Sequence, residues 1–134
     1  MTRNLITVFA IGVCLLLSVA SVSAHHSAAA TYDTTKHITL KGTVTKVEWK
    51  NPHVFYFIDV KDSSGKTVSW AIEASTPNQL YRAGWRKTDL ALGSEITLAN
   101  TSPARNGSNK ASGGAVTLAD GRKVMSGYAG NEGQ

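Results

Sequence analysis

The chain has 134 residues and a formal net charge of +5, and its basic residues are interleaved with acids along its length. Proteins that bind nucleic acid usually concentrate their positive charge in a patch or stripe, so this distribution argues against nucleic acid as a partner. The single cysteine, Cys14, lies in the apolar N-terminal run, so the remainder of the chain cannot form an internal disulfide.

Residues 1–24 predict a secretory signal peptide that is removed by cleavage after Ala24. Arg3 stands in a short charged region, an apolar run follows it, and the small residues Val22, Ser23 and Ala24 fit the cleavage pocket of a signal peptidase. No later apolar stretch is long enough to span a membrane. We therefore expect a periplasmic protein without a membrane span after processing, long enough to form one domain.

The mature chain opens with a short polar segment, residues 25–36, which predicts a flexible N-terminal arm, and the predicted domain covers residues 37–126. Apolar and polar residues alternate over residues 38–44, which predicts a half-buried strand. The apolar positions then shift by one, to Val47 and Trp49, which predicts a bulge or a sharp bend in this strand. Asn51-Pro52 ends it, because proline donates no backbone hydrogen bond.

The next elements are two strands and a short helix. Alternation predicts a second strand over residues 53–60, a turn at residues 62–65 and a third strand over residues 67–73. Thr76 and Gln79 form a capping box with Pro77 at the first helical position, which predicts the start of a helix. Gly84 is the expected stop of that helix.

The last third of the chain predicts more strands around a long polar segment. Residues 93–99 predict a fourth strand, whereas residues 101–114 are rich in Ser, Asn and Gly and predict a mobile loop. Residues 115–118 and 122–125 predict a hairpin around Asp120-Gly121, and residues 127–134 a frayed tail. The expected fold is all-β: a five- to six-stranded OB-type barrel with one short helix between strands three and four. An immunoglobulin-like sandwich would need about seven strands and no such helix.

Several short motifs of the mature chain recur together in one group of proteins. They are His25-His26-Ser27, residues 39–44 leading to Trp49, Asn51-Pro52-His53, Asp59-Val60, Gly84-Trp85 and residues 116–123. In these residues the chain resembles an uncharacterised family of small exported bacterial proteins. The resemblance implies a periplasmic location and a β-barrel, and it implies no activity.

Cleavage after Ala24 would place a histidine at the new N-terminus. His25 would then offer its α-amino nitrogen and a ring nitrogen to one ion, and a further imidazole would complete a three-nitrogen set that suits Cu(II). His53 is the expected partner because it follows the Asn51-Pro52 corner, with His26 as an additional ligand and His37 as a weaker candidate. The alternative is a polar terminus without a metal and a His53 that forms a hydrogen bond at a strand edge.

Large aromatic side chains predict a second kind of site, a ligand-binding surface. OB barrels bind ligands across strands two and three, and exposed aromatic rings serve as stacking platforms there. Phe55 and Phe57 have the parity opposite to the apolar residues of their strand, so they would face outward, and Trp49 precedes them. The alternative is that both faces of the strand are covered; Trp49 and Trp70 are expected in the core.

An enzymatic function is not indicated by the sequence. The mature chain has no thiol, no Gly-x-Ser-x-Gly elbow and no glycine-rich phosphate loop between a strand and a helix. Asp59, Asp62 and Glu73 are better explained as turn and edge residues. We therefore expect a non-catalytic periplasmic module that binds another periplasmic protein or a small ligand; the alternative is a copper-binding protein.

Overall fold

The computed structural model describes residues 29–124, so the predicted signal peptide, His25, His26 and the predicted tail lie outside the described residues. The chain divides before Tyr32 into two compact units, and the account below concerns the described part of the second unit, residues 32–124. Its elements are β1 (Ile38–Glu48), β2 (Phe55–Lys61), β3 (Thr67–Glu73), α3 (Pro77–Arg82), the 3-10 turn η2 (Lys87–Asp89), β4 (Glu95–Pro103), β5 (Lys110–Ser112), β6 (Ala115–Leu118) and β7 (Lys123–Val124).

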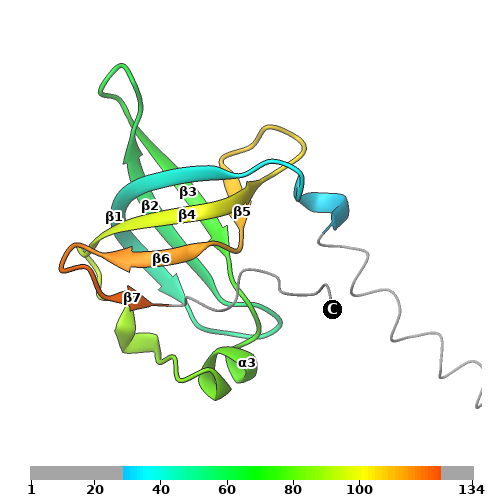
Figure 1. Cartoon of the computed structure of the whole chain (residues 1–134), viewed down its shortest axis with the longest axis vertical. Coiled ribbons are helices and arrows are strands. Elements are labelled where there is room, and N and C mark those ends of the chain that lie inside the picture. The colour runs from blue at the N-terminus through cyan, green and yellow to red at the C-terminus, as the bar shows by residue number, and fades with distance from the viewer. Residues whose placement is uncertain (1–28, 125–134) are drawn as a thin grey trace, which may run out of the picture. The chain divides into compact units, whose positions relative to one another are not determined.

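Five of the strands close into a barrel in the order β1-β2-β3-β5-β4, and β4 pairs again with β1 (Figure 1). The pair β3–β5 is parallel and the other pairs are antiparallel. The hairpin β6–β7 extends the sheet from the second edge of β4, and its turn contains Asp120-Gly121 as predicted. The predicted small barrel, with one short helix between its third and fourth strands, is confirmed.

The first strand serves two neighbours because it is long and bent. Residues 38–43 of β1 pair with β4 and residues 42–48 pair with β2, so Gly42 and Thr43 have a partner on both sides. The register with β2 shifts between Val44 and Lys46, so the predicted irregularity is present where the apolar positions change parity, between Val44 and Val47. Gly42 faces the barrel at a point where the main chain of Asp59 passes so closely that a side chain has no room.

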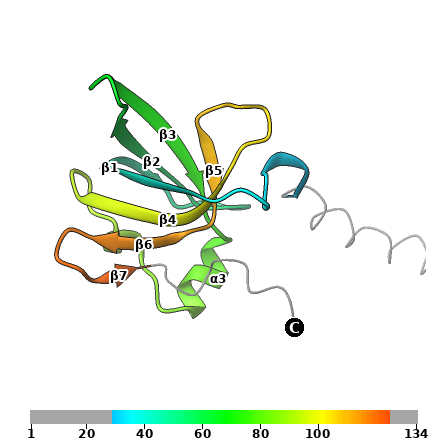
Figure 2. The same cartoon turned by 45° about the horizontal axis from the view of Figure 1, so that its top comes forward.

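The core fills the barrel and ends against the helix. Tyr56, Ile58, Ile72 and Leu98 come from three strands and are almost wholly buried, as alternation predicts. Helix α3 covers one end of the barrel (Figure 2), where Leu80 is fully buried. The predicted cap holds this helix in place: Thr76 accepts a hydrogen bond from the backbone N–H of Gln79, 3.2 Å away. Among residues 29–124, no helix is long and apolar enough to cross a membrane.

The predicted loop over residues 101–114 is wrong, because this segment contains the strand that closes the barrel. β4 continues to Pro103, and β5 pairs with both β3 and β4. Only Ala111 of β5 points into the core, so the segment carries no large apolar residue that would have revealed a strand. Buried Thr101 fixes the closure, since its hydroxyl donates to the carbonyl oxygens of Ser112 and Gly113 at 3.1 and 3.2 Å.

Candidate functional site

Two phenylalanines face outward from β2. Tyr56 and Ile58 point into the core, whereas Phe55 and Phe57 lie on the opposite face of the strand and are half-buried. Phe55 pairs across the sheet with Glu48 and Glu73, and Phe57 with Lys46 and Ala71. Their outward parity therefore agrees with the sequence analysis, and each ring has at least one charged cross-strand neighbour.

Charged groups surround the ring of Phe57. The ammonium nitrogen of Lys46 lies 5.2 Å from the centre of this ring, within the range of a cation–π contact. The same ammonium forms an ion pair of 2.6 Å with Glu48, which also pairs with Lys50 at 3.0 Å. Hydrogen bonds from these two lysines lower the pKa of the Glu48 carboxyl. On the outward side of β2, an aromatic ring therefore lies next to a network of charged side chains.

His53 stands just before β2, at the end of the Asn51-Pro52 corner, where the peptide bond is cis. Backbone hydrogen bonds join Val54 to Ser75 and to Ala74, at 2.9 and 2.8 Å, and so hold this corner against the end of β3. The Nδ1 atom of His53 forms a hydrogen bond with the Oε1 atom of Glu73. The corner thus fixes an imidazole on the outward side of the barrel, where 41% of its side chain remains exposed.

A buried tyrosine holds the other oxygen of the same carboxylate. The Tyr32 hydroxyl donates to Oε2 of Glu73 at 2.6 Å, and Tyr32 is only 3% exposed. Two contacts attach this segment to the end of β4. Tyr32 forms a β-bridge with Ala104, and the backbone N–H of Asp33 donates to the carbonyl oxygen of Pro103 at 2.9 Å. Tyr32, Glu73 and His53 therefore form one chain of hydrogen bonds, which we call the Tyr32–Glu73–His53 relay.

Sequence reasoning found one member of the relay and missed two. His53 was a candidate metal ligand, whereas Tyr32 fell in the predicted arm and Glu73 was assigned to an edge. Two weak signals were present: Tyr32 is a large ring in a polar segment, and Glu73 has the outward parity of its strand. Neither signal reveals that the two residues meet, because 41 positions separate them. Asp62 does cap its turn as expected, accepting hydrogen bonds from Ser64 and Lys66.

The relay leaves one nitrogen of His53 available. A carboxylate only accepts hydrogen bonds, so the neutral form of His53 carries its proton on Nδ1, toward Glu73, and has a lone pair on Nε2. Histidines that bind metals usually donate their other ring nitrogen to a carboxylate in this way. Within residues 29–124, however, no three His, Cys, Asp or Glu side chains come together to hold a metal, and His37 is exposed before β1. His53 can thus hold a metal ion only together with ligands from outside these residues.

Trp49 lies in a different place from Phe55 and Phe57. It lines a small cleft together with Trp85, Val54 and Leu90, and neither phenylalanine contributes to this cleft. Trp49 and Trp70 are half-buried and pack against the core. The structure therefore separates the three aromatic residues of the predicted binding surface: two lie on the outward face of β2 and one at the end of the barrel.

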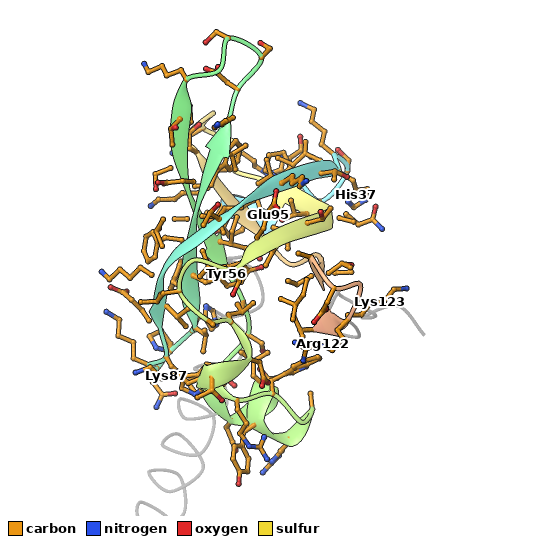
Figure 3. All side chains as sticks on the ribbon, turned by 90° about the vertical axis from the view of Figure 1, so that its left-hand side faces the viewer. His37, Tyr56, Lys87, Glu95, Arg122 and Lys123 are labelled. Atoms are coloured by element: carbon orange, nitrogen blue, oxygen red, sulfur yellow. The ribbon has the colours of Figure 1, made fainter. Side chains whose placement is uncertain are left out.

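The buried tyrosines give the molecule a pH-dependent stability. Burial raises the pKa of Tyr56 (labelled in Figure 3) above its ordinary value near 10; burial, then the hydrogen bond to Glu73 and its negative charge, do the same for Tyr32. Above pH 10 the unfolded chain loses these protons while the folded chain keeps them, so the free energy of unfolding falls as pH rises. Below pH 10 both states are protonated, and neither tyrosine contributes to pH dependence.

We expect the free energy of unfolding to fall above pH 10 by about 1.4 kcal/mol per pH unit for each of the two tyrosines. Tyr56→Phe should remove the contribution of Tyr56 to this slope, and the double variant Tyr32→Phe/Tyr56→Phe should remove the contributions of both tyrosines. Urea denaturation between pH 8 and pH 11.5 measures the slopes. An unchanged slope in Tyr56→Phe would show that its hydroxyl ionises as readily in the folded chain as in the unfolded one.

The comparisons with known proteins give a family and no activity. Residues 13–114 match a family of unknown function, DUF6152, and this range covers most of the chain. No curated protein matches the chain. No solved structure matches it either.

Proposed function

We propose that this chain, which belongs to the DUF6152 family of unknown function, is a small exported binding module of the OB type without catalytic activity. Export to the periplasm is supported by the features of residues 1–24, and a non-catalytic role by the lack of a catalytic motif in the sequence. The strand order β1-β2-β3-β5-β4, the parallel pair β3–β5 and the helix after β3 support the OB-type assignment.

The outward parity of Phe55 and Phe57 is the observation that carries this proposal. His53, Phe55 and Phe57 stand at alternate positions along one side of the chain, roughly 7 Å apart from one to the next. We call these three residues the outward β2 face. Its rings offer a stacking surface, and the free nitrogen of His53 offers one hydrogen-bond acceptor fixed by Glu73. A ligand with an apolar or flat group and a neighbouring donor suits this surface.

A fragment screen by two-dimensional NMR tests this surface, with indole, cellobiose and a short aromatic peptide as probes. We expect shift changes to cluster at residues 53–57 and 71–73 and to disappear in the double variant Phe55→Ser/Phe57→Ser. Tyr81→Ser is the matched control, because it removes an aromatic ring that is 59% exposed elsewhere. Shift changes confined to the cleft of Trp49 and Trp85, or an equal loss in the control, would contradict the proposal.

Copper binding is the second candidate function, and the geometry of His53 favours it. Its Nδ1 atom is engaged by Glu73, so the neutral imidazole has its lone pair on Nε2, as in many metal-binding histidines. In this proposal His25 supplies its α-amino and ring nitrogens, and His26 is an additional ligand.

A Cu(II) titration followed by electron paramagnetic resonance tests the second candidate. The processed protein, its first residue read by mass spectrometry, should bind Cu(II) at sub-micromolar concentration with a nitrogen-rich signal. A chain with one extra residue before His25 should lose this binding, because the α-amino nitrogen no longer belongs to a histidine. A first residue other than His25, or binding that does not respond to the extension and to His53→Ala, would exclude the three-nitrogen site.

A further inference from the structure

The segment that leads from α3 toward β4 exposes apolar side chains and positive charge. Within residues 29–124 the exposed large hydrophobic side chains are Tyr81 and Leu92, at 59% and 68%. They bracket three cations, Arg82, Arg86 and Lys87, all of which are exposed. We call the segment from Tyr81 to Leu92 the basic end segment.

The basic end segment keeps its positive charge uncompensated. Its one acid, Asp89, accepts a hydrogen bond of 2.7 Å from the backbone N–H of Arg86 and caps the turn η2. Neither Arg82 nor Lys87 forms an ion pair within residues 29–124. The surface therefore presents a net positive charge to a partner.

The contacts of Arg86 hold the aromatic and cationic groups together. Its guanidinium lies 3.9 Å from the centre of the Tyr81 ring, and its Nη1 atom donates to the carbonyl oxygens of Tyr81 and Trp85 at 3.2 and 2.8 Å. Trp85 in turn lines the cleft beneath with Trp49. Aromatic rings with one apolar side and one polar side are the residues that collect at the boundary between lipid tails and water.

The segment is anchored on the barrel by Leu90, which is buried, and its cations remain exposed. Figures 1 and 3 show α3 and the residues after it, including labelled Lys87, at the end opposite the β2–β3 hairpin. From this combination of protruding Leu92 and Tyr81 with three exposed cations, we propose that the basic end segment docks the protein on an anionic phospholipid surface. The cations attract the headgroups and the two apolar side chains enter the boundary below them. This surface is separate from the outward β2 face.

Vesicle sedimentation tests the docking. Protein recovered after processing, with its first residue read by mass spectrometry, is mixed with vesicles of phosphatidylcholine alone or with one quarter phosphatidylglycerol. We expect at least about tenfold stronger binding to the anionic vesicles, weakened in 0.5 M NaCl. The double variant Arg82→Glu/Lys87→Glu should lose this preference, and Leu92→Ser should weaken binding by about tenfold.

The matched control reverses two charges at the other end of the barrel. Lys61 and Lys66 flank the β2–β3 turn and are exposed, so Lys61→Glu/Lys66→Glu changes the net charge by the same amount. This control should keep the vesicle binding. Equal loss in both double variants, or no binding to anionic vesicles, would overturn the proposal. So would unchanged vesicle binding in Leu92→Ser together with equally tight binding of soluble dextran sulfate, which would identify a polyanion as the partner.

Discussion

Replacing Gly42 by valine is expected to unfold the barrel or to lower its free energy of unfolding by at least about 3 kcal/mol. A Cβ atom at this position would lie 2.5 Å from the carbonyl oxygen of Asp59 and 3.0 Å from Cγ2 of Val60. β1 cannot move away to make room, because Gly42 pairs with Val60 on one side and with Ile96 on the other. Since small domains are stable by only 5–15 kcal/mol, roughly, the loss is severe.

Thermal and urea denaturation of Gly42→Val, Gly42→Ala and Thr43→Val measures this effect. Alanine carries the same Cβ atom without the extra methyl groups, so it should cost less than valine but still destabilise the chain. Thr43 is exposed on the same strand, and its substitution should change the stability by about 0.5 kcal/mol or less. A Gly42→Val variant as stable as the parent chain would show that β1 and β2 do not approach as closely as described.

Local sequence signals predicted the parts of the fold that are made locally. Alternation gave the inward residues of β2 and β3, and the third strand begins and ends where expected. The capping box of Thr76 and Gln79 gave the start of α3, and Asp120-Gly121 gave the last hairpin. Each of these signals acts over a few residues, so it does not depend on which strands become neighbours.

The closing strand could not be predicted because its identity depends on distant pairing. β5 has only three residues, and its one inward side chain, Ala111, is small and pairs with Ile72 of β3. Its polar sequence is therefore compatible with a loop until β3 and β4 are in place on both sides. Strand propensity is set largely by such neighbours and weakly by the segment itself.

The relay was hidden for the same physical reason. In the sequence, residues of the outward face are recognisable only as polar or aromatic positions within a strand. Their spacing does not predict which distant side chain contacts them. The pair His53–Glu73 spans 20 positions and the pair Tyr32–Glu73 spans 41. Sequence reasoning could name His53 as chemically interesting, but its partner and its free nitrogen follow only from the way the corner and the end of β3 are held together.

Glu73→Ala is expected to lower the free energy of unfolding by about 3 kcal/mol, because it leaves the buried Tyr32 hydroxyl without its acceptor and removes the partner of His53. Most of this loss should come from Tyr32, which is buried. The share of His53 is smaller, since 41% of its side chain is exposed and water screens the pair. Urea denaturation at pH 8 measures the loss, and Glu95→Ala, an exposed acid of β4, is the control.

Glu73→Gln separates the support that the relay gives to the fold from the support that it gives to His53. The amide oxygen can still accept from Tyr32, so this variant should lose only about 1 kcal/mol of stability. Its amide nitrogen would face Nδ1 as a donor, so the proton of the imidazole would move to Nε2, which nitrogen NMR shifts of His53 detect. If ligand or Cu(II) binding through His53 depends on a free Nε2, Glu73→Gln should weaken it while the barrel stays folded. If binding is unchanged while the proton has moved, the carboxylate serves only to attach Tyr32 to the barrel.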